Sequence, residues 1–230
     1  MNWKDLIRRV EPRALLLLFA IVGAVWAFLS IGGEIAEGES LGFDRQMLLA
    51  LRTPGDLNDP IGGRGFEEAM RDVTALGGFT LLTLFTVIAV LTFLAHGKRL
   101  HAAILTVAVL GAQFTGSNLK HIYGRPRPDV VPHGVYVYSG SFPSGHSLMS
   151  AATYLTLAVL LASLESRRSV KLTFFALAVL LMGAIGFSRV YLGVHWPSDV
   201  LGGWCAGAAW AMAAWIALRQ FAKRQDQPKP

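Results

Sequence analysis

The chain has 230 residues, of which 53% are hydrophobic and only 16% are charged, whereas about 25% of the residues in a soluble domain are charged. A chain of this length cannot bury several helices that are apolar on every side, so the composition excludes an ordinary water-soluble protein. The net charge of +6 at pH 7 arises mainly from loops on one side of the predicted spans and indicates no nucleic-acid partner. The sequence therefore predicts an integral membrane protein.

Six apolar segments are long enough, with their flanks, to cross the hydrocarbon core of a bilayer as helices. They are residues 14–31, 73–95, 100–119, 148–164, 172–187 and 200–218. The pattern predicts an all-α fold, with one membrane domain over residues 1–230 and six transmembrane helices. The first segment follows basic residues, as a secretory signal peptide does, but its length and the lack of a clear cleavage site favour a membrane anchor. Cys205 is the only cysteine, so no intramolecular disulfide can form.

The distribution of basic residues predicts the orientation in the membrane. Thirteen of the 21 Lys and Arg residues lie before the first segment, between the second and third, between the fourth and fifth, and after the sixth. They are Lys4, Arg8, Arg9, Arg13, Lys98, Arg99, Arg167, Arg168, Lys171, Arg219, Lys223, Arg224 and Lys229. Because basic loops stay in the cytoplasm, residues 1–13 and the tail 221–230 are predicted to be cytoplasmic. The other loops are predicted to face outward.

The long connection over residues 32–72 is predicted to form a helical cap on the outer side. Its centre, TPGDLNDPIGGRG, is rich in Gly and Pro and separates two amphipathic stretches, FDRQMLLALR and FEEAMRDVTALGG. Each stretch can form a short helix that lies on the membrane surface. A folded cap over the helix ends is the favoured interpretation, and a lid that gates the substrate is the alternative.

The first chemically informative loop, KHIYGRPRP, follows the third segment. Arg125 and Arg127 each precede a proline, which disfavours helix at the arginine and stiffens the loop. A single lysine that reaches the membrane surface is enough to mark a helix end. Two restrained guanidinium groups beside Lys120 indicate instead a site for an anion such as phosphate, whose oxygens match the guanidinium in geometry.

The second loop, SFPSGHS, leads directly into the fourth segment. The first backbone N–H groups of a helix are unpaired and favour an anion, and Gly145 lets a ligand approach them closely. Ser144 is equally well explained as the N-cap of the helix. His146 has no comparable role in a plain helix start, and an imidazole there can donate a proton to a leaving group beside a bound anion.

The third loop, SRVYLGVHWPSD, joins the fifth and sixth segments. Pro197 suits the first position of a helix, so Asp199 falls in its first turn, four residues after His195. A carboxylate there can accept the imidazole N–H and leave the other ring nitrogen free as a nucleophile. Arg189 adds a further cation. The plainer alternative is a helix start with a favourable acid and a surface histidine.

The three loops are predicted to meet on the outer face, which gives active-site loops over residues 120–147 and 188–199. A two-metal site needs several clustered carboxylates or histidines, and only Asp129 and Asp199 are near, so we expect no metal and no cofactor. Ser144 as a serine-hydrolase nucleophile is disfavoured, because the G-x-S-x-G turn is missing and the cations would have no function.

Together the loops resemble the signature of the type-2 phosphatidic acid phosphatase family, which shares its site with vanadium haloperoxidases and bacterial acid phosphatases. That signature is Lys, six residues and Arg-Pro; then Pro-Ser-Gly-His; then Ser-Arg, five residues, His, three residues and Asp. The matching residues are Lys120, Arg127, Pro128, Pro143, Ser144, Gly145, His146, Ser188, Arg189, His195 and Asp199. Every signature position is matched, and the six-helix layout resembles the membrane branch of the family.

The resemblance implies that His195 attacks phosphorus and becomes a phosphohistidine, while Asp199 orients it and supports its positive charge. It implies that His146 protonates the leaving oxygen and then activates water. The implied ligands of the phosphoryl oxygens are Lys120, Arg127, Ser144, the Gly145 amide and Arg189. Such electrostatic stabilisation is often the largest catalytic effect. Arg125 lies outside the signature, and its role stays open.

The expected partner is a phosphorylated lipid in a bacterial inner membrane, with its tail between helices and its head at the outer site. Undecaprenyl pyrophosphate is the first choice, followed by phosphatidylglycerol phosphate, phosphatidic acid and lipid A. A vanadate haloperoxidase and an anion-binding transporter without turnover are the alternatives from other classes. The sequence predicts no oligomeric state.

Overall fold

The computed structural model of the protein describes residues 12–37, 42–135 and 139–225. In chain order its elements are α2 (Pro12–Ala36), α3 (Gly42–Leu49), β1 (Arg52–Thr53), β2 (Asp56–Pro60), α4 (Gly63–Ala75), α5 (Phe79–Ala95), α6 (Arg99–Tyr123), α7 (Gly145–Leu164), α8 (Arg168–Tyr191) and α9 (Pro197–Gln225). Apart from the β1–β2 hairpin, the regular structure of these residues is helical, which confirms the all-α class. Residues 1–11 and 226–230, most of the predicted cytoplasmic ends, lie outside the described residues.

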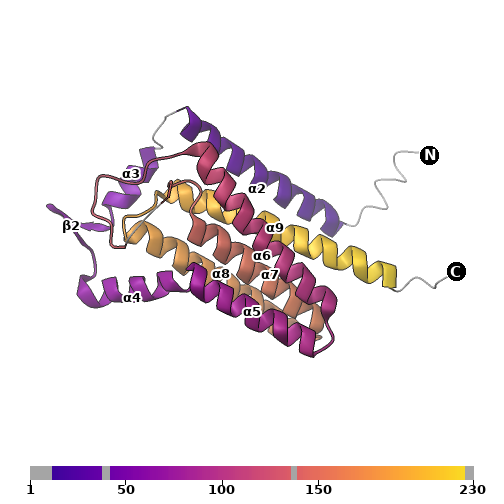
Figure 1. Ribbon diagram of the computed structural model, residues 1–230. Helices are drawn as coiled ribbons and strands as arrows, with labels where there is room; N and C mark the ends of the chain where they lie inside the picture. The colour runs from indigo at the N-terminus through magenta and orange to yellow at the C-terminus, as the bar shows by residue number, and fades with distance from the viewer. Residues whose placement is uncertain (1–11, 38–41, 136–138, 226–230) are drawn as a thin grey trace.

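Long helices coincide with the predicted apolar segments and run side by side as a bundle (Figure 1). Four of them, α6 to α9, are long and apolar enough to cross a membrane. A fifth span results if α4 and α5 are taken as one bent pair. α2 has 25 residues, and the part whose side chains are described, Val22–Ala36, is an apolar helix shorter than a span when taken alone. By length and composition, the described residues thus provide four or five membrane spans.

The second predicted segment, residues 73–95, is not one continuous helix. α4 ends at Ala75, α5 begins at Phe79, and the two are bent by 47°. Gly78 in the break is extended, with φ −74° and ψ 153°. Gly77 permits a close approach of α8, because a Cβ there would lie 2.5 Å from Cγ2 of Ile185. The prediction of one unbroken helix is corrected here, since a pair of glycines interrupts an otherwise apolar pattern.

The position of α7 is central, since it packs against α6, α8 and α9. Glycines on α9 let its backbone approach that of α7 closely. A Cβ on Gly203 would lie 2.8 Å from the carbonyl oxygen of Ser144, and a Cβ on Gly207 would overlap the carbonyl oxygen of Leu148. The backbone N–H of Ser144 also donates to the carbonyl oxygen of Asp199 (2.9 Å). The start of α7 is therefore fixed against the start of α9.

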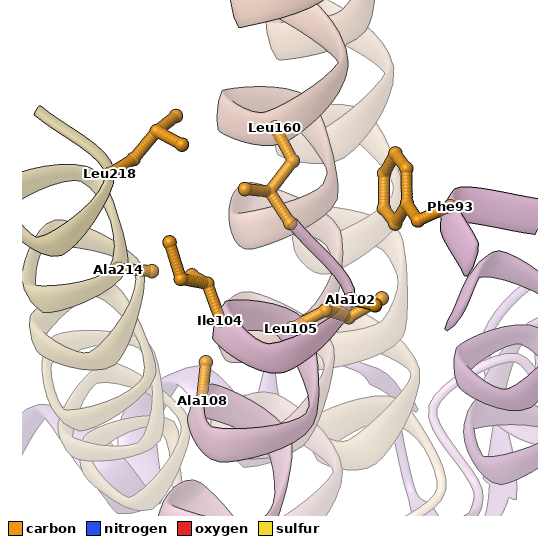
Figure 2. Packing of buried hydrophobic residues seen from close by; sticks show 8 residues of the cluster. All are labelled: Phe93, Ala102, Ile104, Leu105, Ala108, Leu160, Ala214 and Leu218. Atoms are coloured by element: carbon orange, nitrogen blue, oxygen red, sulfur yellow. The ribbon is translucent and has the colours of Figure 1, made fainter. Parts of the chain in front are cut away.

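A hydrophobic cluster joins α5, α6, α7 and α9 near the ends of these helices that lie away from the predicted loops (Figure 2). Its buried members are Phe93, Ala102, Ile104, Leu105, Ala108, Leu160, Ala214 and Leu218. Because lipid tails are as apolar as these side chains, close van der Waals packing rather than exclusion of water favours their association. The cluster holds one end of the bundle together without polar groups.

The connection between α2 and α5 contains two short helices and a hairpin. α3 and α4 correspond to the two amphipathic stretches, whereas the hairpin was not predicted. Asp44 and Leu48 lie on one face of α3, four residues apart, and both are buried. In β1, Arg52 donates to the carbonyl oxygen of Tyr191 at the end of α8 (3.0 Å), and the Tyr191 hydroxyl donates to the carbonyl oxygen of Ile61 (2.7 Å). This connection is therefore bonded to the same end of the bundle as the predicted loops.

Candidate active site

The residues singled out in the sequence are positioned by helix ends at one end of the bundle. Lys120 lies in the last turn of α6 and Arg189 in the last turn of α8. Ser144, Gly145 and His146 form the start of α7. Two further members, Arg127 and His195, lie in the connecting loops, and Asp199 is in the first turn of α9.

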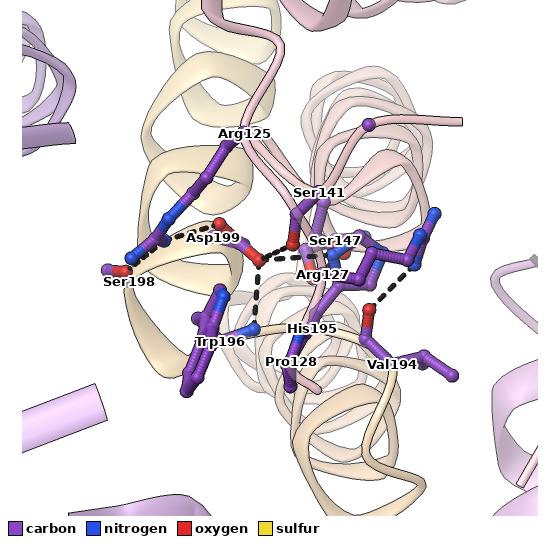
Figure 3. A network of polar contacts seen from close by, with 12 residues as sticks. Arg125, Arg127, Pro128, Ser141, Ser147, Val194, His195, Trp196, Ser198 and Asp199 are labelled. Atoms are coloured by element: carbon purple, nitrogen blue, oxygen red, sulfur yellow. Dashed lines mark hydrogen bonds and ion pairs between the residues drawn. The ribbon is translucent and has the colours of Figure 1, made fainter. Parts of the chain in front are cut away.

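The carboxylate of Asp199 is the central acceptor of the site. Its Oδ2 accepts from the backbone N–H of Trp196 (2.8 Å) and from the Ser141 hydroxyl, and lies 3.3 Å from Nδ1 of His195 (Figure 3). Asp199 has no exposed surface and His195 is only 2% exposed. Because a buried carboxylate must be neutralised or fully hydrogen-bonded, Asp199 holds the imidazole through Nδ1. The alternative of a surface histidine is therefore wrong.

The second ring nitrogen of His195 faces a guanidinium group. Nη1 of Arg127 lies 3.3 Å from Nε2 of His195 and also donates to the carbonyl oxygen of Val194 (2.6 Å). A guanidinium group has only donors, so Nε2 carries the lone pair and Nδ1 carries the hydrogen. Burial lowers the pKa of His195, the contact with Asp199 opposes this, and Arg189 and Arg127 add to the lowering. The imidazole is thus held neutral, in the tautomer that a nucleophilic Nε2 requires.

Three cations, Lys120, Arg127 and Arg189, lie together in the site. Among the described residues, no acidic side chain forms an ion pair with any of the three. Lys120 and Arg189 are each close enough to Arg127 for their positive charges to repel. Lys120 donates to the carbonyl oxygen of Gly140 (2.6 Å), and Arg189 donates to the Thr74 hydroxyl (2.9 Å). The buried Nε of Arg189 has no hydrogen-bond partner in the part of the chain that the structure describes. Like charges gathered in a partly buried site favour an anionic ligand.

The start of α7 forms the floor of this site. The Ser144 side chain accepts from the backbone N–H of Ser147 (3.5 Å) and from its hydroxyl (3.0 Å), so Ser144 is the N-cap that the simpler interpretation predicted. A Cβ on Gly145 would lie 3.6 Å from Cε of Lys120, which shows that the lysine side chain passes directly over this glycine. Binding of phosphate by Ser144 and Gly145 stays a prediction.

Two cavities meet at the start of α7. The larger has a volume of about 600 Å³, lies between α5, α6 and α7, and is lined mainly by apolar side chains, with His146 and Gly145 at one end. Its apolar lining includes Leu82, Val87, Val90, Leu91, Val109 and Leu110. The second, of about 360 Å³, lies between α6 and α7 and is lined by Lys120, Ser117 and His121, and again by Gly145. The site therefore opens into both cavities: the larger one, called the apolar groove from here on, and the smaller, more polar one.

Several residues of the site were missed or left open by the sequence reasoning. Arg125, expected beside Arg127 at the anion, instead contacts the carboxylates of Asp199 and Asp44. Ser141 lies just before the Pro-Ser-Gly-His motif and donates to Asp199. In the sequence, only its position beside that motif could have indicated a place in the site. Asp44 lies in the amphipathic stretch of α3, where the sequence offers nothing to distinguish it from a solvated acid. The described residues contain no group of three or more His, Cys, Asp or Glu side chains arranged to hold a metal ion.

The fold and the site together define a helical membrane protein with a cation-rich site beside a buried histidine that contacts an aspartate. Residues 101–223, more than half of the chain, match the PAP2 superfamily. The chain therefore belongs to the PAP2 superfamily, and it is a hydrolase of the membrane lipid-phosphatase type. The resemblance of the three loops to the type-2 phosphatidic acid phosphatases is thus confirmed.

Individual relatives agree with this assignment. Phosphatidylglycerophosphatase B of Bacillus subtilis (strain 168) is 36% identical over 144 residues, which cover 61% of this chain and 70% of the relative. A putative undecaprenyl-diphosphatase, YbjG of Escherichia coli (strain K12), is 32% identical over 142 residues, which cover 59% and 67%. The crystal structure of a transmembrane PAP2-type phosphatidylglycerolphosphate phosphatase from Bacillus subtilis has a TM-score of 0.75 at 26% identity and covers 92% of this chain and 100% of that chain.

Proposed function

We propose that the protein removes a terminal phosphate from membrane lipids without a metal ion, through a phosphohistidine at His195. The observation that carries this proposal is the buried contact between Asp199 and Nδ1 of His195 (3.3 Å), which leaves Nε2 facing Arg127. The uncompensated cations around it support a phosphate as the ligand, because phosphate needs several strong donors.

The proposed reaction has two steps. Nε2 of His195 attacks phosphorus, the bond from phosphorus to the lipid oxygen breaks, and protonated His146 gives its proton to that oxygen. In the second step His146 takes a proton from water, and the resulting hydroxide displaces Nε2 to release inorganic phosphate. Asp199 balances the positive charge that the imidazole carries in between. Lys120, Arg127, Arg189, Ser144 and the Gly145 amide bind the phosphoryl oxygens throughout.

We propose a lipid whose tail lies in the apolar groove between α5 and α6. The groove supports this, because His146 lies at one end and apolar side chains line the rest. The two relatives from Bacillus subtilis that are named for phosphatidylglycerol phosphate cover 61% and 92% of this chain, and YbjG covers 59%. We therefore propose phosphatidylglycerol phosphate ahead of undecaprenyl pyrophosphate, which the sequence alone put first, with phosphatidic acid and lipid A as further members of the class.

We also propose six spans, with both termini in the cytoplasm, a cap over residues 32–72 and the site on the outer face of the inner membrane. Support comes from the basic loops at residues 98–99 and 167–171, which flank α6 and α8 at the ends away from Lys120 and Arg189.

This orientation predicts which loops an impermeant reagent reaches in intact cells. With Cys205→Ala as background, a membrane-impermeant maleimide should label Asn58→Cys in the hairpin of intact spheroplasts, and Ser166→Cys between α7 and α8 only after permeabilisation. The readout is the labelled fraction on a gel. The opposite pattern, or equal labelling of both, would contradict the orientation.

A panel of lipids tests the activity itself. The purified protein in detergent should release phosphate from phosphatidylglycerol phosphate faster than from undecaprenyl pyrophosphate, phosphatidic acid or lipid A, with no loss in EDTA. His195→Ala and His146→Ala should each reduce kcat by at least about 100-fold. Strong inhibition by EDTA would contradict the metal-free route. Full hydrolysis by His195→Ala would contradict the phosphohistidine, and bromide oxidation with vanadate and peroxide would favour the haloperoxidase alternative.

The groove can be tested with two neighbouring residues of α5. Val87 lines the apolar groove, whereas Ile88, which is similarly exposed (48% and 52%), does not. Val87→Trp should raise KM for a lipid with long acyl chains about tenfold and leave the hydrolysis of a water-soluble aryl phosphate unchanged, because only the long tail needs the groove. Ile88→Trp is the matched control and should affect neither. Equal effects of both variants, or none from Val87→Trp, would place the tail elsewhere.

A further inference from the structure

A buried cluster of charges extends from Asp199 on the side away from His195. Nη1 of Arg125 donates to Oδ1 of Asp199 (2.7 Å), and its Nη2 donates to Oδ2 of Asp44 (2.8 Å). Ser198 completes the cluster, because its backbone N–H donates to Oδ1 of Asp44 (2.8 Å) and its hydroxyl bonds to both Asp44 and Arg125. Asp44, Arg125 and Asp199 are 1%, 8% and 0% exposed. One guanidinium group thus joins α3 to the carboxylate that holds the imidazole (Figure 3 shows the Arg125 end).

The charges of this cluster are completed by a positive imidazole. Two carboxylates and one guanidinium group give a formal charge of −1 while His195 is neutral. When Nε2 is phosphorylated and Nδ1 keeps its hydrogen, the ring is positive and the cluster becomes balanced. Because a buried charge is costly unless it is paired, and because Asp44 and Arg125 cancel each other, the cluster keeps the one negative charge of Asp199 available for a positive His195.

The geometry of Arg125 also restrains Asp199. With Oδ1 held by Arg125, the carboxylate cannot rotate, and Oδ2 stays directed at Trp196 and His195. A lysine at this position cannot replace the planar fork, since one ammonium group does not bridge two carboxylates in the same fixed directions. A buried ion pair gives little stability over apolar side chains of the same volume, so the packing of α3 alone does not require this chain of charges.

We propose that Asp44 and Arg125 are positioning residues for His195, so that docking of α3 sets the orientation of the nucleophile. The inference rests on the proposed role of His195 in phosphoryl transfer. It makes the proposed role of His195 depend on Asp44, which lies in the connection between α2 and α5 and outside the three signature motifs.

The test compares Asp44→Asn, Arg125→Lys and the exposed control Asp72→Asn, each in wild-type and Asp199→Asn backgrounds. We expect Asp44→Asn and Arg125→Lys to lower kcat about 10- to 100-fold, since small misplacement of a reacting group costs rates of this order, with KM changed less than about threefold. In the Asp199→Asn background neither should reduce kcat further by more than about threefold, because the carboxylate through which they act is already lost. Asp72→Asn should match its background in both cases.

Two measurements separate positioning from folding. ¹⁵N-histidine spectra, with His195→Gln to identify the signal, should show the Nδ1 resonance of His195 shifted in Asp44→Asn and unchanged in Asp72→Asn. Arg125→Lys keeps a cation beside the buried Asp199, so it should keep its thermal midpoint in detergent while its kcat falls. If its kcat is that of wild type, or if Asp44→Asn lowers kcat equally in both backgrounds, the positioning role is wrong. If His195→Ala itself retains full activity, the proposed function fails; if His195→Ala is inactive and Asp44→Asn has wild-type kcat, only this inference fails.

Discussion

The structure of the site depends on one buried carboxylate. Asp199 accepts from Trp196, Ser141 and Arg125 and lies against Nδ1 of His195, with no exposed surface. An isolated carboxylate in such a place would cost several kcal/mol, and its donors offset that cost only if three separate segments meet around it. The same contacts that make the charge tolerable therefore fix the loop of His195, the loop before α7 and the start of α9 relative to one another.

The positively charged residues of the site, unlike Asp199, are not paired with opposite charges among the described residues. Lys120, Arg127 and Arg189 come from three other positions and have no carboxylate among the described residues. Backbone carbonyls and Thr74 take only part of their hydrogen-bonding capacity. The hydrogen-bonding capacity of Asp199 is thus used within the protein, whereas that of the three cations is used only in part, so the site is complete around His195 and incomplete around the cations. The apolar groove ends at His146. Charged side chains thus lie at the helix ends, and apolar side chains line the groove along the helices.

The all-α class and the places of the signature residues at helix ends could be predicted from the sequence, because both depend on local patterns. Apolar length sets a membrane helix, and Lys120, His146, His195 and Asp199 fall at helix ends that glycine, serine and proline mark plainly. What it missed depends on distant contacts. The break falls at Gly77 and Gly78, a pair of glycines within an apolar run that by itself favours one helix, and the strands of the β1–β2 hairpin have only two and five residues. The pairing of Arg125 with Asp44 joins positions 81 residues apart, and neither residue type indicates its partner.

The central claim is that Nε2 of His195 carries the phosphoryl group, and rapid quenching of the enzyme with a ³²P-labelled lipid tests it most directly. The account predicts protein-bound phosphate that is stable in alkali and labile in acid, as expected for a phosphoramidate, formed within one turnover and absent in His195→Ala. It also predicts that the label accumulates in His146→Ala when the leaving group needs no proton, since the second step then lacks its base. Label that persists in His195→Ala, or turnover by the wild type with no bound phosphate at any quench time, would contradict the account.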